Sequence, residues 1–177
     1  LVFDPQGAPA AFVKSIKAPF TPLADLNALP ENAKVLLVGN DAIDIKDSAS
    51  TALQAWAVGG RRVVVLAQKT PLRYTAIPAD LELASNEGRT AFIEDLDHHA
   101  MRGLQQKDFF TWGPDHLVYR NAYGKPTRGG KSLVQCHHRL ANSALVEMPV
   151  GNGLLIVDQL LTAEKLSANP VAQKLLL

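Results

Sequence analysis

Lys-Val-Leu-Leu-Val-Gly at residues 34–39 and Arg-Arg-Val-Val-Val-Leu-Ala at residues 61–67 are the two stretches that decide the fold. Both are nearly continuous apolar runs, which is typical of strands buried on both faces of a parallel sheet. Between them, an apolar stripe predicts a helix with Asp47 or Ser48 as its N-cap, and Gly59-Gly60 ends it. The residues of the stripe are Ala49, Ala52, Leu53, Trp56 and Ala57. Strand, helix and strand in about 34 residues predict a βαβ unit with a right-handed crossover.

Shorter elements are predicted on both sides of this unit. A strand at residues 1–3 precedes a helix that opens at Pro9. After the unit come strands at 81–84 and 91–93 and helical turns at 97–105 and 107–110. Four pleated segments separated by glycines then predict antiparallel hairpins, at 117–123, 133–137, 144–148 and 154–157. Thr162 is expected to cap a closing helix that restarts at Asn169-Pro170.

The composition indicates a globular protein and gives no reason to expect nucleic acid or membrane as a partner. The chain has 177 residues, of which 47% are hydrophobic and 20% charged, and its formal net charge is +1. A disordered chain would have fewer apolar residues and more net charge. A charge near zero offers little attraction to nucleic acid or an anionic membrane. No window approaches the roughly 18 uninterrupted apolar residues that a membrane helix needs.

The ends of the sequence lead us to expect a fragment of a longer multidomain chain. The first residue is Leu, and no signal peptide is visible. We expect residues 1–177 to form one domain, and the localisation of the parent protein stays open.

Three parts of the sequence together resemble the class I glutamine-amidotransferase-like domains. Residues 35–42 and 53–68 resemble the central βαβ unit of that family. Asp-His-His-Ala-Met-Arg-Gly-Leu at 97–104 resembles its His-Pro-x-x-x-Gly-Leu turn, with His99 in place of the usual Pro. Residues 144–161 resemble its late hairpin. In order and spacing, these motifs are most similar to the domain of this family that is appended to large bacterial glycoside hydrolases, in particular β-galactosidase-like enzymes of family 2.

The resemblance implies an α/β fold of three layers, α/β/α and flavodoxin-like. Its sheet would be mainly parallel, with an antiparallel hairpin extension in the C-terminal half. Ligands of such sheets bind beyond the carboxyl ends of the strands. The residues expected to rim this crevice are Asp4, Gly39, Asn40, Asp41, Gln68, Lys69 and His98.

The turn after the second strand lacks the nucleophile that an amidotransferase carries there. Such a turn exposes the nucleophile at the sheet edge and directs backbone N–H groups at the oxyanion. Here the turn reads Gln68-Lys69-Thr70-Pro71, without Cys, Ser or flanking glycines. Thr70 is a poor substitute because Pro71 has no N–H to offer. We therefore assign no catalytic residue.

Other candidate sites have simpler structural explanations. Cys136 is read as a small buried thiol beside partly exposed histidines, since it and His137 point to opposite faces of a strand. Asp95, Asp97, His98 and His99 are read as a polar turn, because zinc needs three or four converging ligands. The stretch Gly129-Gly130-Lys131-Ser132 leads into a strand and is not a P-loop. A lone Gly39 is not a dinucleotide fingerprint. No metal or cofactor is expected.

Three hypotheses follow for the function. The first is a non-catalytic spacer or docking domain of a glycoside hydrolase, whose partners are the other domains of its parent chain. It predicts an apolar surface patch for the neighbour. The second is a free-standing hydrolase or amidotransferase relative with relocated chemistry, which predicts a deep pocket and a perturbed titratable group near Gln68, Cys136 or His98. The third is a carbohydrate-binding module. Its only candidate aromatics are Trp112, Tyr74, Tyr119 and Tyr123. A homo-oligomer is also possible.

Overall fold

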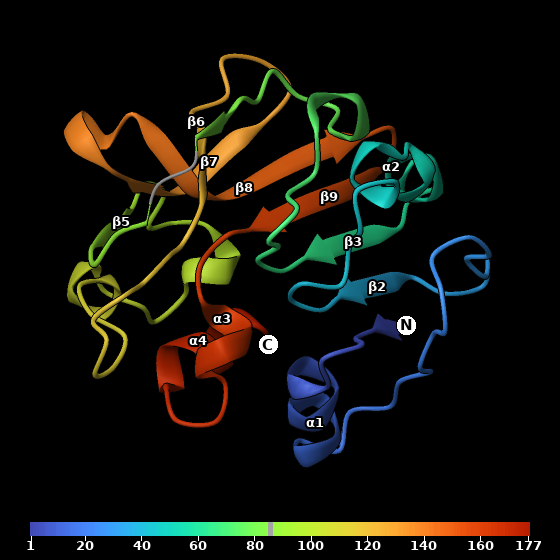
Figure 1. The fold of residues 1–177 in the computed structure, drawn as a ribbon, viewed down its shortest axis with the longest axis horizontal. Helices are drawn as coiled ribbons and strands as arrows, with labels where there is room; N and C mark the ends of the chain where they lie inside the picture. The colour runs from blue at the N-terminus through green and yellow to red at the C-terminus, as the bar shows by residue number, and fades with distance from the viewer. Residues whose placement is uncertain (85–86) are drawn as a thin grey trace.

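A computed structural model, which describes residues 1–84 and 87–177, contains the predicted βαβ unit (Figure 1). β2 (Val35–Val38) and β3 (Arg62–Val65) are parallel neighbours, and α2 (Ala52–Ala57) connects them. Three of the four residues in β2 are buried, which explains its nearly uninterrupted apolar sequence. Gly60 has a φ of 86°, a left-handed conformation that ends the segment after α2 as expected.

All strands of the described residues belong to one mixed sheet. β1 (Val2–Phe3), β2, β3 and β9 (Gly153–Asp158) form its parallel part in that order. The antiparallel part begins at β8, which pairs with β9. It consists of β4 (Leu83–Ala84), β5 (Ala91–Ile93), β6 (Ala122–Gly124), β7 (Lys131–Cys136) and β8 (Asn142–Val150). The expected α/β fold, with a parallel core and antiparallel strands in the C-terminal half, is therefore confirmed. The antiparallel part includes more of the described strands than expected.

Helices cover both faces of the parallel strands, which gives three layers. Leu36, Val38, Val63 and Val65 face α2 and its buried Trp56 in one apolar cluster. The residues between them in sequence face the other way, where Leu37 and Val64 belong to a different cluster. That second face is covered by three helices: α1 (Ala8–Ser15), α3 (Thr162–Lys165) and α4 (Pro170–Leu175) (Figure 1).

A separate core lies under the antiparallel half. Its largest buried side chains are Phe109, Trp112 and Tyr119. The short helices η3 (His99–Met101) and η4 (Gln106–Phe109) supply part of it, at the positions predicted for helical turns. None of the helices in the described residues is long and apolar enough to span a membrane.

Three local predictions are wrong. The helix expected from residue 47 is interrupted: η1 (Asp47–Ala49) is a separate turn, and neither Asp47 nor Ser48 caps α2, which has Thr51 at its N-cap position. Thr162 is not the cap of α3, because its hydroxyl donates to the side chain of Asp158. The strand expected at 117–123 is shortened to β6. By contrast, the Asn169 side chain caps α4 as predicted.

Candidate functional site

The carboxyl ends of β1, β2, β3 and β9 meet at one edge of the sheet, because all four strands run in the same direction. The segments that follow them begin at Asp4, Gly39, Leu66 and Gln159. This edge is where open α/β sheets bind ligands. A ligand-binding or catalytic site is therefore expected at this edge.

Gln68 lies in the turn after β3, and its side chain points into the protein. The side chain oxygen Oε1 accepts hydrogen bonds from the backbone N–H groups of Ala42 and Ile43, at 2.8 and 2.9 Å. Its Nε2 donates to the carbonyl oxygens of Gly39 and Leu66, both at 2.6 Å. Only 2% of Gln68 is exposed. The residue at this turn therefore ties the loop after β2 to the end of β3.

Asp4 and Gly39 lie in direct contact across the ends of β1 and β2. One carboxylate oxygen of Asp4 accepts a hydrogen bond from Ala10 N–H in the first turn of α1, at 2.9 Å. A Cβ on Gly39 would overlap the other oxygen of this carboxylate, so a side chain has no room at this position. Among the described residues, that second oxygen and Oδ1 of Asn40 are buried without a hydrogen-bond partner. The same holds for both side chain polar atoms of Gln159.

The open space at this edge is a crevice of only about 60 Å³. Its lining residues are Asp41, Ala67, Gln68, Lys69, Arg120, Asn121, Leu161 and Glu164. The charges at its rim neutralise each other: Lys69 pairs with Asp41 at 3.5 Å, and Arg120 pairs with Glu164 at 3.1 Å. Ligand pockets are typically about 300–1,000 Å³. The crevice is too small for a substrate of that size.

His98 lies at a different place from the other rim candidates. Its Nε2 is 3.3 Å from a carboxylate oxygen of Glu147, and its Nδ1 accepts a hydrogen bond from Ala100 N–H. With His99 and Asp158 it lines a cavity of about 70 Å³, separate from the crevice. The structure thus groups Asp41, Gln68 and Lys69 around the crevice, has Asp4, Gly39 and Asn40 beside it, and leaves His98 apart.

Two acidic residues near His98, Glu147 and Asp95, have protein partners. Asp95 pairs with Lys131, whose ammonium group holds the pKa of this carboxyl below its usual range. Asp95 also accepts a hydrogen bond from the backbone of Asp97. Over the described part of the chain, no three His, Cys, Asp or Glu side chains are grouped closely enough to hold a metal ion.

Asp158, at the end of β9, is a buried titratable residue that sequence reasoning missed. Burial raises the pKa of its carboxyl to about 7, although hydrogen bonds from Thr162 Oγ1 and Leu160 N–H oppose the shift. Two sequence signals could have identified it: it directly follows an apolar strand, and a threonine lies four residues later. Both of its oxygens are occupied by these donors, which suits a structural role.

Cys136 is a fully buried thiol, as predicted, and His137 and His138 beside it are exposed. Burial raises the pKa of the Cys136 thiol to about 11, so the thiol is protonated at neutral pH. A nucleophilic cysteine needs the opposite, a lowered pKa in an accessible and electropositive setting. Cys136 is unsuited to nucleophilic catalysis.

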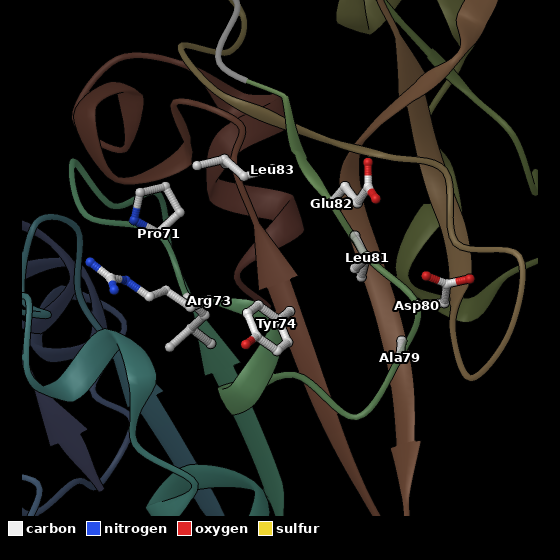
Figure 2. A pocket seen from close by; sticks show the side chains of 9 residues that line it. Pro71, Arg73, Tyr74, Ala79, Asp80, Leu81, Glu82 and Leu83 are labelled. Carbon is white, nitrogen blue, oxygen red and sulfur yellow. The ribbon is translucent and has the colours of Figure 1, made fainter.

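The four aromatic candidates for sugar binding fall into two groups. Trp112, Tyr119 and Tyr123 are almost completely buried. Tyr74 is 78% exposed. It lies in a groove of about 540 Å³ that is formed by residues 71–74 and 79–83, away from the crevice (Figure 2). The platform of coplanar, exposed aromatics that we considered is therefore wrong for these residues.

The fold is similar to parts of several solved glycosidases. For the exo-β-1,4-mannosidase Op5Man5 from Opitutaceae bacterium strain TAV5, the TM-score is 0.56 at 13% identity, over 89% of this chain and 26% of that chain. For the β-galactosidase from Rahnella sp. R3, it is 0.51 at 10% identity, over 86% and 24%. The chain thus spans about a quarter of the length of these enzymes. Identities this low show the fold alone.

A further structure covers most of a shorter protein. The Cytoplasmic Protein STM3548 from Salmonella typhimurium has a TM-score of 0.60 at 10% identity, over 95% of this chain and 82% of that chain. No family model matches the sequence, and no curated protein matches it.

Proposed function

We propose that this chain is a non-catalytic accessory domain of a glycoside hydrolase of the β-galactosidase-like kind, with a glutamine-amidotransferase-like fold. Its role is that of a spacer or docking domain for the other domains of the parent chain. The similarity to about a quarter of two glycosidases supports this, because a domain built into a larger enzyme gives such a partial match.

The observation that carries the proposal is the direction of the Gln68 side chain. A nucleophile at this turn must reach a substrate carbonyl and must have backbone N–H groups aimed at the oxyanion. Gln68 instead uses its side chain to bind the backbone of the loop after β2. The N–H groups of Ala42 and Ile43 already donate to Gln68 Oε1 and are therefore not free to bind an oxyanion. The turn has a structural role in place of a chemical one.

A relocated active site is the second candidate, and Asp158 is the residue that favours it. Its raised pKa is of the kind that marks general acids and bases. However, the cavity it lines has a volume of about 70 Å³, whereas one water takes about 30 Å³ of liquid volume. A sugar or an amide substrate does not fit there. The accessory function therefore explains the geometry better.

Activity assays on the protein separate the two candidates. We expect no release of ammonia from L-glutamine, and no hydrolysis of p-nitrophenyl acetate, β-galactoside or β-mannoside above the buffer rate. The same assays on the variants Asp158→Asn, Asp41→Asn and Cys136→Ser identify trace contamination, because a contaminant's turnover is the same in every variant. Turnover that one of these substitutions abolishes would contradict the accessory function.

A second test concerns the gene. A glycoside hydrolase catalytic domain encoded in the same reading frame would support the proposal. A reading frame that encodes this chain alone would defeat it.

A further inference from the structure

One groove of the described residues lies outside the carboxyl edge and has no role in the proposed function. Two short segments line it, Pro71–Tyr74 and Ala79–Leu83, and its volume of about 540 Å³ falls within the usual range of small-molecule sites. Figure 2 shows Tyr74 between Arg73 on one side and Asp80 and Leu81 on the other. The groove thus combines an aromatic ring with charged groups of both signs.

The Tyr74 side chain is exposed to solvent, and the backbone on both sides of it is fixed by buried residues and hydrogen bonds. On one side, Leu72 is buried and its carbonyl accepts a hydrogen bond from the Tyr123 hydroxyl at 3.1 Å. On the other side, Ala76 is buried. The N–H of Arg73 donates to the carbonyl of Ser48 at 2.8 Å. With its neighbours fixed, the ring is 78% exposed and its apolar surface is free to cover a ligand.

The opposite side of the groove is fixed in the same way. Asp80 N–H donates to the carbonyl of Arg128, and a carboxylate oxygen of Asp80 accepts from Thr127 Oγ1 at 2.7 Å. The carbonyl of Glu82 accepts from Gly124 N–H at 2.7 Å, while its side chain is exposed. Leu81, between the two acidic residues, is buried and anchors the segment. The carboxylates are therefore presented by a rigid backbone.

We propose that this groove binds a neutral saccharide, with one sugar ring stacked on Tyr74. A pyranose has an apolar C–H face that suits an aromatic ring, and its edge carries hydroxyl groups that both donate and accept hydrogen bonds. Arg73 lines the groove on one side of the ring, and Asp80 and Glu82 line it on the other. The ends of the Arg73 and Glu82 side chains point away from the ring in Figure 2, so they donate to and accept from a bound sugar only after turning toward it. Hydrogen bonds from hydroxyl groups to charged side chains are stronger than those between neutral groups.

Other ligand classes fit the groove less well. An anion would meet the carboxylates of Asp80 and Glu82. A quaternary ammonium ion is held by a cage of several aromatic rings, whereas the groove has one ring and also the cationic Arg73. A neutral ligand rich in hydroxyl groups can bind beside both the cationic and the anionic side chains of the groove. The inference stands without the proposed accessory function, because it depends only on this groove.

Titration of the protein with mannobiose, galactobiose and cellobiose, followed by NMR and calorimetry, tests the inference. At least one disaccharide is expected to bind and to shift the resonances of Tyr74. Tyr74→Ala should weaken binding about tenfold or more, whereas Tyr74→Phe should retain most of it. Glu82→Gln should weaken it by a smaller factor. Leu96→Ala serves as the control, because it removes an exposed apolar side chain outside the groove and should leave the affinity unchanged.

Choline chloride and inorganic phosphate are the competing probes. The inference is overturned if none of the disaccharides binds, if Tyr74→Ala binds as tightly as the unaltered protein, or if choline or phosphate binds in the groove and the disaccharides do not. Circular dichroism of each variant verifies that the fold is retained. The result of the binding experiments does not affect the activity assays of the proposed function, so the two proposals can fail independently.

Discussion

Gln68 forms more hydrogen bonds with the backbone than any other side chain at the carboxyl edge described above, and its removal should cost stability. Gln68→Ala leaves the N–H groups of Ala42 and Ile43 and the carbonyl of Gly39 without their partner. Unsatisfied buried polar groups cost about 1–3 kcal/mol each, partly offset by entering water. We expect the free energy of unfolding, measured by urea denaturation, to fall by about 2–4 kcal/mol.

The neighbouring residue provides the matched control. The Lys69 side chain is 86% exposed, and its ion pair with Asp41 is at the surface. Lys69→Ala should change the free energy of unfolding by less than about 1 kcal/mol. Equal effects of the two substitutions would contradict the structural role of Gln68.

Asp158 should make the protein less stable as the pH rises from about 4 to about 7. Its folded pKa is about 7, above the ordinary carboxyl value of 3.8, so in this range the folded state binds more protons than the unfolded state. The stability that Asp158 contributes when protonated is therefore lost as pH rises through this window. Asp158→Asn cannot ionise; its amide oxygen can still accept from Leu160 N–H, and its amide nitrogen can donate to Thr162 Oγ1, which reverses the direction of that hydrogen bond. We expect it to remove this pH dependence and to raise stability at pH 8 by about 1–3 kcal/mol.

Melting temperatures at half-unit pH steps measure this effect. Asp115→Asn is the control, because Lys165 lowers the pKa of the exposed Asp115 carboxyl and gives it the opposite, weaker dependence. Parallel stability curves for the unaltered protein and Asp158→Asn would rule out a buried, neutral Asp158.

At the scale of elements, Gly153 determines how closely β9 approaches α2. A Cβ at this position would overlap the carbonyl oxygens of Ala57 and Arg61, which are backbone atoms that cannot rotate away. Gly153→Ala should therefore reduce the free energy of unfolding by about 3 kcal/mol or more, as measured by urea denaturation. For Gly124→Ala the nearest atom is the Glu82 carbonyl at an ordinary 3.6 Å, and we expect a loss within about 1 kcal/mol. A similar loss in both variants would contradict this packing.

The elements that the sequence predicts well are those covered by other layers on both faces. The valine-rich runs of β2 and β3 lie between two layers, so their composition alone reveals a buried parallel strand. The segment 117–123 was predicted too long because its apolar residues have another use. Val118 and Tyr119 fill the second core, and Tyr119 pairs only in isolated bridges, with Gly88 and Leu160. An apolar pattern cannot distinguish a strand from a loop that is packed into the core.

The crevice was predictable in position but not in detail. Strand polarity alone brings Gly39, Asp41 and Gln68 to one edge of the sheet. The direction of a side chain at a turn depends on tertiary contacts, so the inward orientation of Gln68 could not be predicted from the sequence. The same applies to aromatic residues. For Trp112, the neighbouring Gly113-Pro114 leaves a surface position open, although a place in a small core is favoured; in the structure its Nε1 donates to the Asp108 carbonyl and its ring is buried.

At the scale of the whole molecule, the two large apolar cores share the central strands. Val146 and Met148 of β8 belong to the core beneath α2, whereas Ala144 and Leu145 of the same strand belong to the core of the antiparallel half. β9 bonds to β3 on one side and to β8 on the other. If one core loses its packing, these strands are disrupted, and the other core is then disrupted as well.

This shared sheet predicts that residues 1–177 unfold as one cooperative unit, and the two tryptophans of the chain can test it. Trp56 lies in the core beneath α2, and Trp112 lies in the other core. In Trp112→Phe the fluorescence reports only the first core, and in Trp56→Phe only the second. Within each variant, the urea midpoint from fluorescence should coincide with the midpoint from far-UV circular dichroism. Comparison within one variant removes the stability cost of the substitution itself. A fluorescence midpoint that differs from the circular dichroism midpoint would mean that the halves unfold separately, and the single-domain expectation would then be wrong.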